Sequence, residues 1–570
     1  MAEEVWMLQT KKADFKQIGA RFRIDPVTAR IIRNRGIEGE AAIARYLNGT
    51  LDDLYDPMLL KDMERAVSIL CEAVDTGKKI RIVGDYDIDG VCSTYILLQA
   101  FERLGSDVDF EIPDRIKDGY GINESIIEQA HADGVEVILT CDNGISAFHQ
   151  VELAKKYGMT VVITDHHEVP LDGEKEKIPP ADAVIDPKQA DCPYPFPEIC
   201  GAVVAYKLVQ VLYARRGVPQ MEWLDLLEFA AIATVGDVMK LQDENRILVK
   251  YGLKKMAQTK NLGLRRLAEK NNLDLGAITA YHIGFVIGPC LNAGGRLKTA
   301  KEALALLRAQ SEEEAERLAE ELKELNDTRK DMTEQGTEAA KLQVESWYQK
   351  DKVLVVFLPE CHESLAGIIA GRLREYYQKP AIVLTRGEEA VKGSGRSIDE
   401  YHMFKKLTEV SDLLLKFGGH PLAAGLSLEE KNIDEFRRRL NENAGLTEED
   451  FKAKVWIDVP MPVGYVTERL VRELSCLEPF GQGNEKPLFA EKSLRIRASR
   501  VLGRNRNVVK MTLEETDGHA IEALYFGDGT AFEEERAGRR EIDVVYYPDI
   551  NEYNGRKTLQ AVIRRYKFRG

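Results

Sequence analysis

Four short apolar runs, each followed within two residues by an aspartate, constrain the fold of this chain more than any other feature. They are rich in Val, Ile, Leu and Thr and occupy residues 79–83, 135–140, 160–164 and 183–185. Segments of helical composition separate them, and near-continuous apolar character is typical of parallel strands buried on both faces. The alternation predicts an α/β domain built on a parallel sheet.

The aspartates that end these runs have a predictable position. Ligands of open parallel sheets bind beyond the carboxyl ends of the strands. We therefore expect the four side chains to lie along one edge of the sheet: Asp85, Asp142, Asp165 and Asp186.

The first run continues into residues 84–90, Gly-Asp-Tyr-Asp-Ile-Asp-Gly, which place three carboxylates in a tight turn. Carboxylates this close repel one another unless cations neutralise them. Oxygen ligands favour Mg²⁺ or Mn²⁺, and a nearby imidazole shifts the balance toward Mn²⁺. The alternative is a solvated acidic turn or a single calcium loop. An EF-hand is excluded, because the twelfth position counted from Asp85 holds Ile96 instead of Glu.

Two further strand ends carry possible metal ligands. Asp142 lies in the run 140–144, Thr-Cys-Asp-Asn-Gly, and Asp165, His166 and His167 follow the next strand. A lone histidine is usually a structural hydrogen-bonding residue. Asp-His-His beside two other acidic strand ends instead indicates a metal site with its supporting groups.

The remainder of the chain predicts three more parts. Residues 311–347 are rich in Glu and Lys, with leucines at helical spacing and Ser311 and Glu314 as a capping box, which indicates a long connecting helix. Strand runs at 352–357 and 381–385 begin a second α/β unit that continues to about residue 450.

Beyond residue 455 the pattern changes to alternating strands, with an Asn554-Gly555 hairpin signal. Basic residues cluster there at 495–510 and, interleaved with Tyr566 and Phe568, at 564–568. This combination predicts a small barrel that follows a nucleic-acid backbone and stacks bases.

Composition sets wider limits. A net charge of −15 would ordinarily count against a nucleic-acid partner, but a carboxylate-rich metal site and a basic groove can coexist on one surface. The eight cysteines form no C-x-x-C pair, which argues against a disulfide framework and a zinc site. We find neither a membrane-spanning stretch nor a secretory signal, so a cytoplasmic protein is expected.

Taken together, the motifs resemble the DHH phosphoesterase superfamily, and in detail the RecJ family of 5′-to-3′ single-strand-specific exonucleases. The resemblance covers almost the whole chain. Besides the three strand-end motifs, it rests on the runs 233–238, 291–297, 393–397, 418–425 and 479–484.

The resemblance implies an α/β multidomain protein: a parallel-sheet DHH domain, a long connecting helix, a second α/β domain of the DHHA1 type and a C-terminal OB-like β-barrel. We place these parts at residues 61–310, 311–347, 348–450 and 455–570, after an N-terminal segment 1–60. It also implies two divalent ions, Mn²⁺ or Mg²⁺. Their ligands would be Asp87, Asp89, Asp142, His166 and Asp237, with Asp85, Asp165 and His167 as catalytic residues that support or share the site.

Substrate contacts carry over in the same way. The implied phosphate-facing residues are Arg115, Tyr120, Arg296, Ser394, Arg396 and His420, and Ser394, Arg396 and His420 would hold a 5′-terminal phosphate. For the glycines of these motifs, simple turn formation is the alternative. Residues 360–367 depart from the family, because the usual Trp-His-x-Gly is replaced around His362, so substrate handling there is less defined than the metal chemistry.

The implied activity is metal-dependent, processive hydrolysis of single-stranded DNA from the 5′ end, in recombination and repair. One alternative is a DHH phosphodiesterase for short oligonucleotides or cyclic dinucleotides, which would need no basic β-rich tail. Another is a non-catalytic DNA-binding scaffold, which would lack an intact ligand set. We expect a monomer, with a helicase and a single-strand-binding protein as candidate partners.

Overall fold

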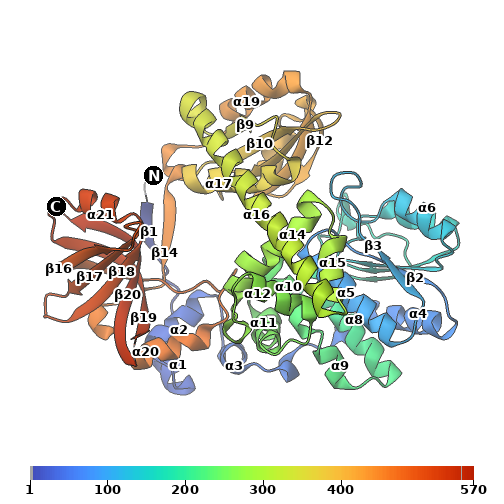
Figure 1. The fold of residues 1–570 in the computed structure, drawn as a ribbon, viewed down its shortest axis with the longest axis horizontal. Coiled ribbons are helices and arrows are strands. Elements are labelled where there is room, and N and C mark those ends of the chain that lie inside the picture. The colour runs from blue at the N-terminus through green and yellow to red at the C-terminus, as the bar shows by residue number, and fades with distance from the viewer. Residues whose placement is uncertain (1–3, 554, 570) are drawn as a thin grey trace. The chain divides into compact units, whose positions relative to one another are not determined.

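The computed structural model describes residues 4–553 and 555–569, which form two compact units (Figure 1). The first comprises mainly Leu54–Met239 and Ile247–Ala453. The second comprises Glu4–Asp53, Lys240–Arg246 and the chain from Lys454 onward.

A five-stranded parallel sheet lies at the centre of the first unit, in the order β3-β2-β4-β5-β8. Its strands are β2 (Ile80–Val83), β3 (Val108–Glu111), β4 (Val137–Cys141), β5 (Thr160–Thr164) and β8 (Ala183–Ile185). The predicted parallel sheet is confirmed, with four of its strands at the expected runs. β3 was not predicted. It lies at the sheet edge, where it is only half-buried and Asp109 pairs with Arg81 of β2 at 2.7 Å.

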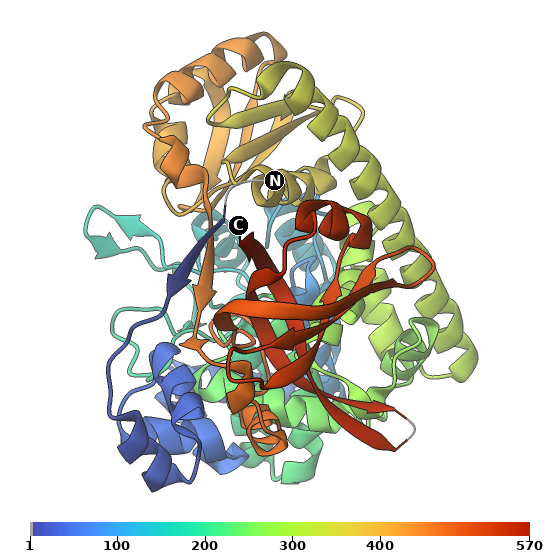
Figure 2. The same cartoon turned by 90° about the vertical axis from the view of Figure 1, so that its left-hand side faces the viewer.

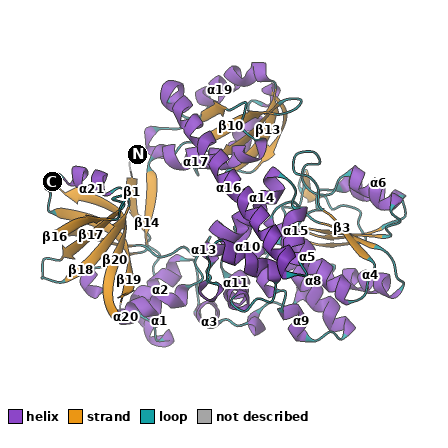
Figure 3. Ribbon diagram, in the orientation of Figure 1, coloured by secondary structure: helices purple, strands orange, loops and turns teal. Residues whose placement is uncertain are grey.

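Helices cover both faces of this sheet (Figure 3). On one face, α6 (Glu124–Ala132) and α7 (Phe148–Lys156) share a hydrophobic core with the strands. On the other lie α4 (Met63–Asp75), α5 (Ile88–Arg103) and α8 (Gly201–Arg216). Nearly every residue of α5 and of the first three turns of α8 is buried, because α10 (Leu227–Gly236) also packs on them.

Further helices connect the parallel sheet to a second sheet in the first unit. It contains α9 (Gln220–Leu224), α11 (Asp243–Met256), α12 (Leu262–Lys270), α13 (Ala280–His282), a π-helix η4 (Ile283–Ile287), α14 (Gly288–Leu297) and α15 (Lys301–Arg308). The predicted connecting helix is α16 (Glu312–Gln343). Ser311 caps it by accepting from the Glu314 N–H at 3.1 Å, whereas the Glu314 carboxylate accepts from Gln310 instead of closing the box on Ser311.

The second sheet has the order β12-β13-β11-β10-β9. β9 (Leu354–Phe357) and β10 (Ala381–Arg386) are parallel, while β11 (Val391–Arg396), β13 (Ala423–Leu428) and β12 (Leu414–Gly419) are antiparallel. One face packs on α16 and α17 (Ala366–Tyr377) and the other on α18 (Met403–Thr408) and α19 (Ile433–Glu442).

The second unit is a barrel (Figure 2). Its sheet order is β15-β16-β17-β18-β20-β19, and an additional β16–β19 pairing closes it. The long strands are β16 (Phe489–Leu502), β17 (Val508–Glu514), β18 (Ala520–Phe526), β19 (Glu541–Tyr553) and β20 (Arg556–Arg569). The hairpin predicted at Asn554-Gly555 joins β19 to β20, although Asn554 itself lies outside the described residues.

The N-terminal helices share the core of this barrel. Ile31 and Ile32 of α2 (Pro26–Asn34) and Tyr46 of α3 (Glu40–Asn48) belong to the same hydrophobic cluster as Phe489 and Phe532. The smaller elements of this unit are α1 (Phe15–Phe22), α20 (Glu468–Leu474), α21 (Gly529–Arg536), β1 (Glu4–Leu8), β14 (Ala453–Ile457) and β15 (Val459–Pro460). Within the described ranges, no helix has both the length and the apolar character needed to cross a bilayer.

Candidate metal centre and substrate cleft

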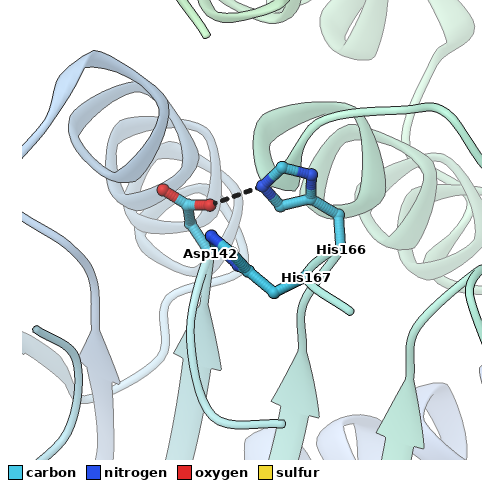
Figure 4. A group of neighbouring side chains, drawn as sticks. All are labelled: Asp142, His166 and His167. Atoms are coloured by element: carbon cyan, nitrogen blue, oxygen red, sulfur yellow. Dashed lines mark ion pairs between the residues drawn. The ribbon is translucent and has the colours of Figure 1, made fainter. Parts of the chain in front are cut away.

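The carboxyl ends of β2, β4 and β5 bring acidic and imidazole side chains together in the first unit. Potential ligand atoms lie within 4.8 Å of one another in three overlapping groups. The groups are Asp85, Asp87 and Asp142; Asp89, His166 and Asp237; and Asp142, His166 and His167. All eight predicted metal-site residues except Asp165 thus belong to one cluster, part of which Figure 4 shows.

The start of α5 positions the first carboxylates. Asp87 is its N-cap and accepts from the N–H groups of Asp89 at 2.9 Å and Gly90 at 3.1 Å. Gly90 is required, since a Cβ there would lie 2.4 Å from the carbonyl oxygen of Asp85. The fully buried Asp89 carboxylate accepts from the backbone of Gly201 at the start of α8, where N–H groups have no intrahelical partner.

Asp142 follows β4 with a φ of 62°, in the left-handed region that Asp and Asn tolerate better than most residues. Its neighbour Asn143 holds the turn: the side-chain amide donates to the Val83 carbonyl at 3.0 Å and its oxygen accepts from the Ile122 N–H at 3.2 Å. Asn143 therefore ties the ends of β2 and β4 together. Sequence reasoning did not single it out, although its place directly after a strand-end aspartate was a usable signal.

Within the Asp-His-His segment, His166 and Asp165 have different roles. His166 Nε2 lies 3.0 Å from Asp142 Oδ1 and 3.5 Å from Asp89 Oδ2, so it points into the cluster (Figure 4). Asp165 points instead toward protein donors: the Ile145 N–H at 2.9 Å and His167 Nδ1 at 2.7 Å. This geometry suits a residue that orients the histidines.

The electrostatics of the cluster favour divalent cations. Burial, and then the charge of neighbouring carboxylates, raises the pKa of Asp85 and Asp142 well above the usual value and that of Asp237 to about 8. Burial would lower the pKa of His167, but the hydrogen bond with Asp165 and the charges of the neighbouring carboxylates together outweigh this effect and raise the pKa to about 9. Crowded carboxylates with an imidazole are a donor set that fits Mn²⁺ or Mg²⁺.

Tyr120 and Arg115 adjoin the cluster. The Tyr120 hydroxyl donates to the Asp142 carbonyl at 2.7 Å and lies 3.0 Å from His167 Nδ1. The Arg115 guanidinium lies over the ring of Tyr86, 4.7 Å from its centroid. Asp186, which we left out of the ligand set, is buried, and its carboxylate accepts from the Lys188 N–H at 2.8 Å. Burial, and then the charge of Asp165, raises its pKa to about 7.

A cleft of about 600 Å³ is lined by Arg115, Arg296, Ser394, Arg396 and Gly367. Arg296 donates to the Ser364 carbonyl at 2.9 Å and Arg396 to Ser394 Oγ at 3.1 Å. No ion pair among the described residues engages any of its three arginines. Burial, and then the nearby Arg115, lowers the pKa of Arg296 to about 10. Such uncompensated positive charge suits a phosphate.

Gly367, the second residue of α17, faces the same groups. A Cβ there would lie 2.9 Å from Ser394 Oγ and 3.0 Å from Arg396 Nη2. In the segment that departs from the family pattern, His362 Nδ1 lies 2.7 Å from Ser364 Oγ, next to the carbonyl that Arg296 contacts. His420, in contrast, occupies the exposed turn between β12 and β13 and does not line the cleft.

Arg329 of α16 is a site residue that sequence reasoning missed. It lines a second cavity of about 110 Å³ together with Arg296 and Asn292. Burial, and then the charge of Arg372, lowers its pKa. Its place among many charged residues of a long helix gave no signal, because only the fold shows which face turns toward the site.

The barrel carries part of the predicted basic surface. Arg500 and Arg504 are exposed and take part in no ion pair within the described ranges, whereas Arg497 pairs with Glu514 at 3.3 Å. In the last strand, the aromatic residues expected to stack bases are partly buried against the barrel core, and base stacking by them stays a prediction. Tyr566 and Phe568 turn inward, with ring centroids 4.8 and 5.1 Å from that of Phe532.

Three family models match this chain. They describe the DHH family N-terminal domain at residues 79–234, the DHHA1 domain at 350–445 and the RecJ OB domain at 457–565.

Known proteins resemble the chain along nearly its full length. The single-stranded-DNA-specific exonuclease RecJ of Bacillus subtilis (strain 168) is 36% identical over 564 residues, which cover 98% of this chain and 70% of that protein. The crystal structure of RecJ from Thermus thermophilus in complex with Mn²⁺ superposes with a TM-score of 0.84 at 28% identity, covering 99% of this chain and 80% of that one. The Mg²⁺ complex gives a TM-score of 0.77 at 27% identity, over 99% and 78%.

Proposed function

Because the chain belongs to the RecJ family of single-stranded-DNA-specific exonucleases, we propose that it removes nucleotides processively from the 5′ end of single-stranded DNA, in recombination and repair. The reaction is hydrolysis of a phosphodiester bond with Mn²⁺ or Mg²⁺ as cofactor. The observation that supports the proposed polarity is the adjacency of the carboxylate cluster to a cleft of unpaired arginines.

We assign Asp87, Asp89, Asp142, His166 and Asp237 as metal ligands, since their potential ligand atoms fall in overlapping groups whose members lie within 4.8 Å of one another. A bound pair of divalent ions supplies the water activation and the charge stabilisation of an in-line displacement at phosphorus. The protein's part is to hold the ligands in place: helix N-termini fix the carboxylates of α5, and backbone donors fix Asp165.

The 5′ polarity is assigned to the arginine cleft. The cleft offers charge-assisted hydrogen bonds to a terminal phosphate from Arg115, Arg296, Arg396 and Ser394. Tyr120 lies beside the proposed metal ligands, because its hydroxyl donates to the Asp142 carbonyl. Arg115 and Arg296 are close enough to Tyr86 to influence its pKa, so the cleft begins beside the ligand-bearing turn. An end bound here leaves its first phosphodiester bond near the carboxylates. His420 is proposed as an outer contact only, because its turn is exposed.

We further propose that residues 61–310, 348–450 and 455–570 act as phosphoesterase, end-binding and strand-binding domains. The barrel's exposed arginines suit a single-stranded backbone, which a dinucleotide enzyme would not need. The intact ligand set speaks against a non-catalytic scaffold. The cytoplasmic location, the monomeric state and the helicase and single-strand-binding partners stay predictions.

A time course on end-labelled DNA tests the activity. With Mn²⁺ or Mg²⁺, the 5′ label of a single strand should appear at once as mononucleotide, while a 3′ label stays on long fragments and matched duplex is spared. Early release of the 3′ label would overturn the proposed polarity. Cleavage confined to dinucleotides would instead indicate a DHH phosphodiesterase for short oligonucleotides. Binding without cleavage under either metal would indicate the scaffold.

A further inference from the structure

Two large aromatic side chains are exposed to solvent on the segment that leads into α14. Tyr281 is 63% exposed and Phe285 is 67% exposed. Their rings are stacked, with centroids 4.8 Å apart and planes 27° from parallel. Two adjoining exposed rings form a contiguous apolar patch, and such patches can mark binding surfaces. Neither residue belongs to the metal cluster or to the arginine cleft.

The helical backbone places the two rings on the same face. α13 continues directly into the π-helix η4, so that Tyr281 and Phe285, four residues apart, lie on one face. The start of this segment is fixed because the Thr279 N–H donates to His282 Nδ1 at 3.1 Å in a capping box. Single π-helical turns are rare and occur most often at functional sites.

The same segment packs against the ligand-bearing turns. A Cβ at Gly284 would lie 3.7 Å from Val235, two residues before Asp237, and one at Gly288 would lie 3.3 Å from Ile88. Ile88 separates Asp87 from Asp89 in the chain. The backbone that carries the two rings therefore rests on the start of α5 and the end of α10, which hold three of the proposed ligands.

The backbone that carries the rings lines a cavity that shares Arg296 with the substrate cleft. Gly284 and Gly288, on either side of Phe285, line the 110 Å³ cavity with Asn292, Arg296 and Arg329. Arg296 also lines the 600 Å³ cleft. Asn292 Oδ1 is buried and has no hydrogen-bond partner in the described part of the chain, so an acceptor at this wall is free for a ligand.

We propose that Tyr281 and Phe285 form a stacking platform for nucleobases of the substrate strand, a role that rests on the proposed exonuclease function. Every base has an apolar face that stacks on an aromatic ring, and the arginines beside the platform suit the attached phosphates. A base in a duplex is already covered on both faces and would have to leave its stack. The platform thus selects single strands as well as binding them.

Abasic DNA separates stacking from other roles of the two rings. The double variant Tyr281→Ala/Phe285→Ala should raise KM for single-stranded DNA about tenfold or more, with a smaller change in kcat. On a strand whose nucleotides near the 5′ end are abasic, the double variant and wild type should have the same KM, because no base is present to stack. Tyr281→Phe should keep the wild-type KM. Because both side chains are mostly exposed, the melting temperature should stay unchanged.

A matched control is Trp347→Ala, which removes a ring that is 69% exposed in the π-helix η5 (Val344–Tyr348) and should leave KM unaltered. A wild-type KM in the double variant, or an equal defect on intact and abasic strands, would overturn the platform and leave the rings as a contact for another protein. Quenching of 2-aminopurine in a strand bound in EDTA tests stacking without hydrolysis. If wild type quenches the probe but cuts no DNA, only the proposed function fails. If it cuts DNA without quenching, only the platform fails.

Discussion

The carboxylate of Asp89 accepts a hydrogen bond of 2.7 Å from the backbone N–H of Gly201, the first residue of α8. A second bond of 2.8 Å comes from Ala202. Two helices thus meet at one buried carboxylate, which holds the start of α5 against the start of α8. Gly201 also lies against Asp142, because a Cβ added to it would be 2.7 Å from that residue's Cβ. The separation of two proposed ligands therefore depends on a missing methyl group.

Gly201→Ala should displace Asp142 and lower Mn²⁺ affinity by about tenfold or more, since ligand geometry controls affinity. The measurement is the Mn²⁺ concentration that gives half-maximal hydrolysis, together with the shift of melting temperature on adding Mn²⁺. Gly371→Ala in α17 is the control, because a Cβ there has no heavy atom within 4 Å. Equal Mn²⁺ dependence in both variants would contradict the contact.

Asp142→Asn should abolish hydrolysis while leaving the protein folded, because the change removes a ligand and no core volume. In EDTA its melting temperature should rise, since burial and then the charges of neighbouring carboxylates raise the pKa of Asp142 well above its usual value, which makes its charged form unfavourable there. Thermal melts with EDTA and with Mn²⁺ give both readouts. Turnover at the wild-type rate would remove Asp142 from the site.

The metal-free protein should lose stability as pH rises from about 6 to 9. Asp237 has a folded pKa of about 8, above its unfolded value, so the folded state binds more protons until the pH passes about 8. The pKa of His167, raised from 6.5 to about 9, acts in the same direction, because its contribution is lost as the pH rises through about 9.

Melting temperatures measured in EDTA and in Mn²⁺ across this range check the sign. Mn²⁺ requires deprotonated ligands, so its stabilisation should grow with pH and reduce the decline. Asp237→Asn should flatten the EDTA curve. A metal-free melting temperature that rises with pH would show that other groups outweigh the cluster.

The sequence predicted the parts of this site whose residues directly follow recognisable strands. Buried strands that end at Asp85, Asp142 and Asp165 share one edge of a parallel sheet, so the gathering of these strand-end residues followed from their positions after the apolar runs, whereas Asp237 followed only from the family resemblance. β3 was missed because an edge strand is half-buried and lacks the apolar run. The packing of Tyr566 on Phe532 and the approach of Arg329 to the 110 Å³ cavity depend on tertiary packing, which leaves no periodic signal.

Arg396→Ala should reduce kcat/KM on 5′-phosphorylated single strands by about 10- to 100-fold, the loss expected for a charge-assisted hydrogen bond of roughly 1.5–3 kcal/mol. On 5′-hydroxyl strands the variant should match wild type, since no terminal phosphate is present to lose the contact. Arg386→Ala is the control, because that arginine is exposed and pairs with Glu430 at 3.2 Å. An equal loss on both substrates would assign Arg396 to general strand binding.

Strand binding by the barrel is tested better by substitution than by deletion of residues 455–570. Arg246 donates to the carbonyls of Cys476 and Leu477, both at 2.8 Å, and its guanidinium lies over the Tyr46 ring. A deletion would leave this buried charge and the apolar faces of α2 and α3 uncovered. Its effect on DNA binding would then be mixed with loss of folding.

Arg500→Gln/Arg504→Gln removes two exposed charges without touching the core. If both arginines contact phosphates, the slope of log K against log salt for a long single strand should become shallower by about 0.7 per contact. A very short oligonucleotide held at the cleft should change less. Arg438→Gln/Arg439→Gln is matched in charge, and its arginines pair with Glu435 and Asp412 on the surface of the first unit. Because ion-paired arginines release few counterions, this control should keep the wild-type slope. Equal slopes in the two double variants would remove the barrel arginines from the DNA path.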